Sequence, residues 1–236
     1  MAALWANAFR YISDCLRGWG AIMDGLFLVD KPYRWSSFQA TAWVKKYFAV
    51  RKAGHAGTLD PLATGLLLVA VDEMTRQLSV LQELPKEYYA LVILGYRTLS
   101  DDAEFEPEKV AIPSPMSEEE RRAILSTFVG EIEQRPPAFS ALKVEGKRAY
   151  ALARRGEVVS LPPRRVKIYA IDEIAYEPPY RWLLRIECGK GVYIRSLARD
   201  IGEKTGWGAY LGALRRTRIG TYSVLQAIQP DGYLSR

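Results

Sequence analysis

The sequence predicts an α+β fold with a mixed sheet. Predicted strands and helices follow one another without the regular strand–helix–strand repetition that a parallel sheet requires. No internal repeat, low-complexity segment or convincing linker divides the 236 residues. Nearly half of the residues are hydrophobic, so the chain can bury a sizeable core without disulfides.

The first half of the chain alternates apolar runs with capped helical patterns. Residues 1–22 carry apolar side chains at helical spacing, but Arg10, Asp14 and Arg17 interrupt them, which disfavours a signal peptide and excludes a membrane span. Met23 is an alternative start of the original chain. The elements expected next are a strand at 25–29, a helix capped by Ser36 and Ser37, a strand at 66–71, a short helix at 75–81 and a strand at 87–95.

The second half begins with an acidic loop at 101–108, for which we favour solvation over metal binding. Ser117 and Glu120 have capping-box spacing, which predicts a helix that continues to Gly130. The remaining expected elements are an extended connector at 135–139, a basic helix at 149–155, strands at 166–176 and 181–188, a helix from Tyr193 to before Gly206, a helix at 209–215 and a strand at 220–224.

Composition excludes several classes of site. The two cysteines, Cys15 and Cys188, cannot form a disulfide framework or a cysteine-rich zinc site, and they favour a reducing, cytoplasmic setting. The only histidine is His55, so a histidine-rich metal site is not available and a Ser/His/Asp triad would have to use it. These counts disfavour metal and triad chemistry.

The positive charge is concentrated in one segment. The whole chain carries a net charge of +6, and residues 135–167 contain nine Lys or Arg against two acids, so the rest averages near neutrality. Phe139 and Tyr150 lie among these cations. Arginine suits phosphate geometry, so the segment predicts nucleic-acid binding ahead of a merely solvated surface.

One stretch, residues 54–65, reads Gly-His-Ala-Gly-Thr-Leu-Asp-Pro-Leu-Ala-Thr-Gly. Its glycines allow tight turns or close approach of another molecule. Asp60 before Pro61 suits a helix start, with Gly65 ending that helix after about one turn. Taken alone, the pattern favours a capping aspartate over a catalytic carboxylate on a loop.

Several motifs together resemble the TruB family of pseudouridine synthases. The stretch at 54–65 is similar to the family's catalytic loop. The other matching segments, in family order, are Asp30-Lys31-Pro32 with Trp35-Ser36-Ser37, Lys86-Glu87-Tyr88, residues 140–150, residues 190–195 and Leu214-Arg215-Arg216. Six motifs in order over residues 23–228 are very unlikely to agree by chance.

The resemblance implies a role for each matching residue. Asp60 would be catalytic, Arg195 would pair with its carboxylate, and Tyr88 would stack on the target base. Leu214 would wall the uracil pocket and His55 would fill the space left by flipped nucleotides. Lys31 and Tyr193 would support substrate binding, and the cations expected on the RNA backbone are Lys143, Lys147, Arg148, Arg154 and Arg155.

The resemblance also implies a fold, a substrate and a setting. The fold would be a mixed, mainly antiparallel central sheet flanked by helices and loops around a catalytic cleft. The substrate would be the uridine at T-loop position 55 in the T arm of transfer RNA, with no metal, cofactor or membrane. The sequence Pro-Leu-Ala-Thr-Gly resembles the stand-alone bacterial members of the family more than the guide-RNA-dependent relatives, so no obligate protein partner is expected.

We expect the catalytic domain at residues 23–236, an RNA-binding insertion at about 135–168, an N-terminal helical extension at 1–22, and no C-terminal PUA domain after the Leu214 motif. Two competing functions remain open. A non-catalytic chaperone of transfer RNA would use the basic insertion without needing Asp60. A nucleoside-cleaving glycosylase would need a further group that activates water.

Overall fold

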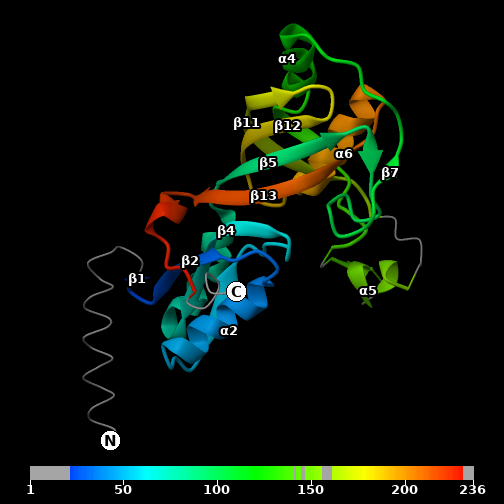
Figure 1. Ribbon diagram of the computed structural model, residues 1–236. Coiled ribbons are helices and arrows are strands. Elements are labelled where there is room, and N and C mark those ends of the chain that lie inside the picture. Colours follow the sequence, from blue (N-terminus) through cyan, green and yellow to red (C-terminus); the bar gives the residue numbers. More distant parts are fainter. Residues whose placement is uncertain (1–21, 141, 145–146, 156–160, 231–236) are drawn as a thin grey trace, which may run out of the picture. The chain divides into compact units, whose positions relative to one another are not determined.

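A computed structural model describes residues 22–140, 142–144, 147–155 and 161–230 (Figure 1). The predicted helix at 1–22 therefore falls almost wholly outside the described residues. The chain forms two compact units. Unit 1 comprises the residues up to Glu87 together with those from Arg215 onward, and unit 2 comprises Tyr88–Leu214.

Unit 1 is built on a sheet in the order β1-β2-β4-β13, with β3 paired to β4 and β14 paired to β13. The registered pairs are antiparallel, with Phe27 opposite Val69 on one side of β4 and His55 opposite Val69 on the other. The strands are β1 (Ile22–Met23), β2 (Leu26–Lys31), β3 (Ala53–Ala56), β4 (Ala63–Val71), β14 (Tyr222–Ser223) and the end of β13 (Ala209–Ile219).

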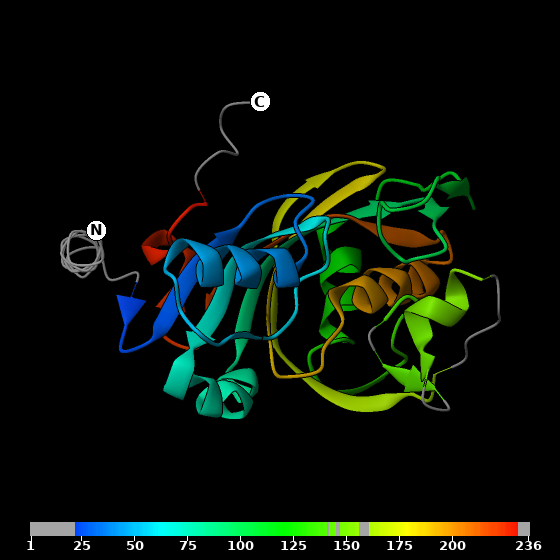
Figure 2. The same cartoon turned by 90° about the horizontal axis from the view of Figure 1, so that it is seen from below.

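Both faces of this sheet are covered, which explains why β4 is apolar from Leu66 to Val71. Helix α2 (Ser37–Tyr47) covers one face of the unit 1 strands (Figure 2). It packs Ala40 and Val44 against Val69. Helix α3 (Leu78–Glu83), which follows the 3-10 helix η1 (Asp72–Gln77), packs Leu81 into the opposite cluster. The predicted cap of α2 is confirmed, because Ser36 and Gln39 form a capping box.

Unit 2 contains the strand order β13-β5-β12-β11-β8. The strands are β5 (Lys86–Leu94), β8 (Gly130–Gln134), β11 (Arg164–Glu177) and β12 (Arg181–Cys188), with two small hairpins, β6 (Tyr96–Arg97) with β7 (Glu108–Lys109), and β9 (Lys143–Val144) with β10 (Lys147–Arg148). Its helices are α4 (Glu118–Ser126), α5 (Ala149–Ala153) and α6 (Ile194–Thr205). Helix α6 buries Ile194, Leu197 and Ile201, and the α+β, mainly antiparallel prediction is confirmed.

The predicted helix from Asp60 to Gly65 is wrong. The Ala63 N–H does donate to the Asp60 carbonyl at 3.1 Å, but the turn leads directly into β4. Gly65 has φ +102°, and a Cβ there would lie 2.2 Å from the Arg216 carbonyl oxygen. Gly65 is therefore required by close strand packing and not by a helix end.

The predicted helix at 209–215 is also wrong, because these residues form β13. Their helix propensity is overridden by pairing with β5. Gly212 permits that approach, since a Cβ there would lie 2.7 Å from Ile93 Cγ1. Helix α4 ends earlier than expected, and Gly130 instead begins β8.

Candidate active site

Asp60 lies in unit 1, in the short segment between β3 and β4. Its side chain is half-buried, whereas Leu59 before it and Ala63 after it are buried. Asp60 therefore lies at the edge of a packed loop, between buried neighbours. Such a position suits a reactive group on a rigid scaffold.

Arg216 holds both ends of this loop. Its side chain is buried, and its guanidinium donates from Nη2 to the Gly57 carbonyl at 2.9 Å and from Nε to the Leu66 carbonyl at 2.7 Å. Hydrogen bonds from a charged donor are among the stronger ones in proteins. Residues 57–66 are thus bridged by one planar side chain from β13.

Two further buried side chains hold the middle of the loop. Ser37 Oγ donates to the Leu59 carbonyl at 2.9 Å and accepts from the Leu59 N–H at 2.8 Å. The Lys31 ammonium donates to the carbonyls of Pro32, Trp35 and Pro61 at 3.0, 2.5 and 3.4 Å. The loop that carries Asp60 is therefore fixed before any substrate arrives.

Lys31 also sets the electrostatics beside Asp60. Burial lowers the pKa of the Lys31 ammonium to about 8, while the negative charge of Asp60 opposes that shift and Arg216 adds to it. The amine is still mostly protonated at neutral pH. A cation near Asp60 favours the ionised carboxylate, which is the form that can stabilise positive charge on a sugar.

His55 lies in β3 and not on a free loop, and it is half-buried. Nδ1 is 3.0 Å from Thr41 Oγ1, and Nε2 is 3.1 Å from Thr58 Oγ1. Burial and the charge of Arg216 lower the pKa of His55 below its usual value. The imidazole is therefore mainly neutral at pH 7. The hydroxyls of Thr41 and Thr58 bind its two nitrogens and so orient the ring. The predicted insertion of His55 into RNA stays a prediction.

Arg195 lies in unit 2 at the start of α6 and is buried. It donates to the carbonyls of Ser100 and Phe139 at 3.0 and 2.9 Å, and its Nε lies 3.7 Å from Asp102 Oδ2. Within its own unit, then, this guanidinium is organised by the 100–102 segment. The predicted pair with Asp60 joins residues of different units and stays a prediction.

The other predicted substrate residues also lie in unit 2. Tyr88 is buried in β5, and Leu214 is half-buried in β13. Tyr193 caps α6, and its backbone N–H and carbonyl both bond to the buried amide of Gln134 at 2.8 and 3.1 Å. The start of α6 is thereby fixed to β8.

The predicted RNA-backbone residues fall in two groups. Lys143, Lys147 and Arg148 occupy the β9–β10 hairpin, and their side chains lie outside the described part of the structure. Arg154 and Arg155 are exposed after α5, and Arg154 pairs with Glu104 at 2.7 Å above the Tyr150 ring. The contact with Glu104 would have to exchange for a phosphate if Arg154 binds RNA.

Part of the basic segment at 135–167 lies opposite acidic residues that precede the segment in sequence and so were not counted with it. On β11, Arg165 and Lys167 stand opposite Glu133 and Glu131 of β8 in the antiparallel register. Opposite charges across a ladder attract. The cations at the end of the segment are therefore less available to phosphates than their number indicates.

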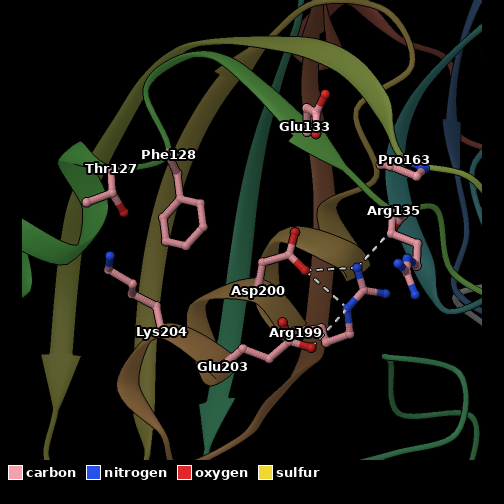
Figure 3. Close-up of a pocket in the computed structure, with 9 residues that line it drawn as sticks. All are labelled: Thr127, Phe128, Glu133, Arg135, Pro163, Arg199, Asp200, Glu203 and Lys204. Atoms are coloured by element: carbon pink, nitrogen blue, oxygen red, sulfur yellow. Dashed lines mark hydrogen bonds and ion pairs between the residues drawn. The ribbon is translucent and has the colours of Figure 1, made fainter.

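A cavity of about 830 Å³ lies within unit 2 (Figure 3). It is lined by Thr127, Phe128, Glu133, Arg135, Pro163, Arg199, Asp200, Glu203 and Lys204. Its central cation, Arg199, is already paired with Asp101 and Asp200 at 2.9 and 2.8 Å and donates to the Arg135 carbonyl. None of the predicted catalytic residues lines it, so we do not place the reaction there.

The acidic loop at 101–108 is not simply solvated, contrary to the sequence prediction, because Asp102 is buried and Asp101 is half-buried at its start. Asp101 pairs with Arg199, although burial raises the pKa of Asp101 to about 6. Asp102 accepts from Ser100 Oγ at 2.5 Å and from the Glu104 N–H at 3.0 Å. Among the described residues, no group of three His, Cys, Asp or Glu side chains is arranged to hold a metal ion, and no helix is long and apolar enough to cross a bilayer.

Two family models match the chain in succession. Residues 45–194 match the TruB family pseudouridylate synthase N-terminal domain, and residues 195–230 match the tRNA pseudouridylate synthase B C-terminal domain. The first match includes Asp60 and Tyr88, and the second begins at Arg195. Fold and motifs together define a pseudouridylate synthase by class.

Curated relatives narrow the assignment. The chain is 44% identical over 214 residues to tRNA pseudouridine synthase B of Leifsonia xyli subsp. xyli (strain CTCB07), covering 88% of this chain and 71% of the relative. It is 42% identical to the protein of the same name from Arthrobacter sp. (strain FB24), covering 87% and 69%. The chain belongs to the TruB family, and the resemblance inferred from its motifs is confirmed.

Solved structures agree on the fold. A crystal structure of a Cbf5-Nop10-Gar1 complex contains a chain that matches with a TM-score of 0.67 at 32% identity. An H/ACA RNP bound to a substrate RNA containing 2'-deoxyuridine matches with a TM-score of 0.63 at 30% identity. These matches cover 91% and 87% of this chain but only 54% and 50% of the matched chains, so this chain spans about half of their length.

Sequence reasoning missed Arg216 and Ser37 as the residues that hold the catalytic loop. The glycines at 57 and 65 indicate a close approach to that loop, but they do not identify the approaching residue. Arg216 is 159 positions away from Gly57 in sequence. Only the pairing of β13 with β4 brings the two together.

Proposed function

We propose that this chain converts uridine to pseudouridine at T-loop position 55 of transfer RNA, with Asp60 as the essential residue. The observation that carries the proposal is the family loop held rigidly by Arg216, Ser37 and Lys31, which presents one half-buried carboxylate. The names of the curated relatives support transfer RNA as the substrate. Position 55 and the T arm rest on the family resemblance.

The reaction is an isomerisation. The N1–C1′ bond of the uridine breaks, the uracil turns, a bond forms between C5 and C1′, and the proton on C5 leaves while N1 gains one. Cleavage builds positive charge at C1′, which an ionised carboxylate stabilises directly, by attack, or by taking the 2′ proton. One acid is sufficient because no water has to be activated.

The remaining residues take the roles that the family motifs give them. Tyr88 stacks on the uracil and Leu214 walls its pocket, while Arg195 pairs with Asp60. Tyr193 supports the same region through its backbone contacts with Gln134. His55 occupies the gap left by the flipped nucleotides, for which a neutral, oriented ring is suited.

The experiment uses a transfer RNA transcript tritiated at uracil C5, and it measures both tritium release and free uracil. Release without free uracil supports the synthase. Free uracil would identify a glycosylase, and binding with no release would leave the chaperone. A transcript in which the T-loop uridine is replaced by cytidine serves as the control for position, because it should release no tritium above background.

We further propose that the enzyme acts in the cytoplasm and without an obligate protein partner. Cys188 is a free, buried thiol, which agrees with a reducing setting. One matched structure is a complex with two further proteins, so the purified chain alone should be assayed first. Activity of that single chain would support a stand-alone enzyme, and activity only after addition of a cell extract would oppose it.

A further inference from the structure

A second basic segment lies in unit 1, the unit that also carries the loop of Asp60. Residues 31–52 contain six Lys or Arg and no Asp or Glu. The near-neutral average outside residues 135–167 therefore conceals a strong local charge. Apart from Lys31 the cations are exposed, and within the described residues none of these five forms an ion pair.

Exposed aromatic rings lie among these cations. Phe38 is 75% exposed on the first turn of α2, and Tyr33 is 42% exposed just before it. The Arg34 guanidinium lies 5.6 Å from the centroid of the Tyr33 ring. Arginine and aromatic faces beside free cations are what proteins use to stack unpaired bases and hold the connecting phosphates.

The segment that carries these side chains is hydrogen-bonded directly to the catalytic loop. The Arg34 N–H donates to the Pro61 carbonyl at 2.8 Å, and Ser37 is bonded twice to Leu59. Residues 34–37 thus lie against both neighbours of Asp60. RNA whose target nucleotide reaches Asp60 must pass beside this segment.

The backbone gives a second, independent indication. Arg34 has φ +66°, in the left-handed region where a residue other than glycine is strained by about 1–2 kcal/mol. A glycine would remove that strain. An arginine at this position is therefore best explained by its side chain.

We propose that the exposed side chains of Tyr33, Arg34 and Phe38, with Lys45 and Lys46 behind them on α2, form an RNA-binding surface. It takes the unpaired loop nucleotides that flank the target uridine. Phe38 and Tyr33 stack on bases and Arg34 contacts a phosphate. The inference rests on the proposed function, because it names how the same site selects an open loop over a paired helix.

The test measures the affinity of the whole chain for a fluorescent T-arm stem–loop. Phe38→Ala should weaken binding about 5-fold to 100-fold, the range expected for losing one stacked base, and Phe38→Trp should restore it. Arg34→Gly keeps the backbone conformation and should reduce the salt dependence by about one phosphate contact. Leu225→Ala, at a side chain 93% exposed in the same unit, is the matched control and should change nothing.

An abasic scan of the loop identifies the stacked base. At one flanking position the abasic RNA should bind wild type more weakly, and there the Phe38→Ala penalty should disappear. The proposal is overturned if Phe38→Ala and Tyr33→Ala each bind within about twofold of wild type, or if the penalty persists at every abasic position. Loss of binding to an acidic peptide but not to RNA would instead identify a protein-binding face.

Failure of this inference is distinct from failure of the proposed function. Tritium release by the wild-type chain tests the reaction and does not depend on Phe38. An active enzyme with unaffected Phe38 and Tyr33 variants would remove the surface and leave the isomerase in place.

Discussion

Replacing Arg216 by glutamine removes a charged side chain that is bonded to both ends of the Asp60 loop. Two carbonyls, the part-buried one of Gly57 and the buried one of Leu66, lose donors at 2.9 and 2.7 Å. A hydrogen bond from a charged donor contributes about 1.5–3 kcal/mol, and a buried acceptor left unsatisfied costs about 1–3 kcal/mol. We expect unfolding free energy to fall by about 2–5 kcal/mol, since the two estimates describe overlapping losses.

The activity should fall further than stability explains. A displacement of about 1 Å in a reacting group can reduce a rate about 100-fold, so kcat should drop by that order while KM for RNA changes little. Urea unfolding and tritium-release kinetics, measured at a temperature where the variant stays folded, give the two numbers. Arg218→Gln, at an exposed position of the same strand, is the matched control.

Arg216 also lowers the pKa of His55. Because His55 is the only histidine, its imidazole resonances in an NMR titration need no assignment. In Arg216→Gln the pKa of His55 should rise toward 6.5. If Arg216→Gln keeps wild-type kcat, stability and His55 pKa, the argument that this side chain fixes the loop is refuted.

Three further predictions follow from the same contacts. In the wild type, His55 should titrate below 6.5, so its contribution to stability is present above that pH and declines in acid; a measured pKa of 6.5 or higher would contradict the burial argument. The pKa of Lys31 is about 8 in the folded state and 10.5 in the unfolded state, so the unfolding free energy of the wild type should rise as pH increases between those values. Lys31→Met should lack this rise. Equal pH slopes for the two proteins would contradict the lowered pKa of Lys31. Gly65→Ala should lower the unfolding free energy far more than Gly206→Ala. Both glycines have positive φ, but a Cβ would lie 2.2 Å from a backbone atom at Gly65 and would meet nothing within 4 Å at Gly206. Similar losses of unfolding free energy would show that φ alone matters.

Local patterns predicted the fold where local rules decide it. The capping boxes at Ser36 and Ser117 mark the true starts of α2 and α4, and Gly206 ends α6 in the left-handed conformation. The apolar run of β4 and the alternation of β5 were also sufficient. These features depend on residues that are neighbours in sequence, so they can be predicted from a single sequence.

The errors arose where distant strands decide. Residues 209–215 favour a helix by composition, but pairing with β5 makes them part of β13. Asp60 and Pro61 suit a helix start, but β4 begins shortly after them. Gly65 in β4 is already paired with Lys31 in β2. The same long-range pairing brings Arg216 to Gly57, so the residue that holds the loop was as unpredictable as the strand that carries it.

The candidate site was predicted in part for a related reason. Asp60 and its supporting motifs are recognisable because their sequences are specific to one family. The basic segment at 31–52 was visible in the sequence, yet a count over the whole chain averaged it away. Its significance depends on the hydrogen bonds that place residues 34–37 against Leu59 and Pro61.

The central claim is that Asp60 carries the isomerisation of a transfer RNA uridine. It is tested most directly by tritium release from C5-tritiated transfer RNA with Asp60→Asn beside Glu73→Gln, which removes an exposed carboxylate of the same unit. We expect release by wild type and Glu73→Gln, no release by Asp60→Asn, and retained RNA binding by all three. Wild-type rates of release from Asp60→Asn would contradict it.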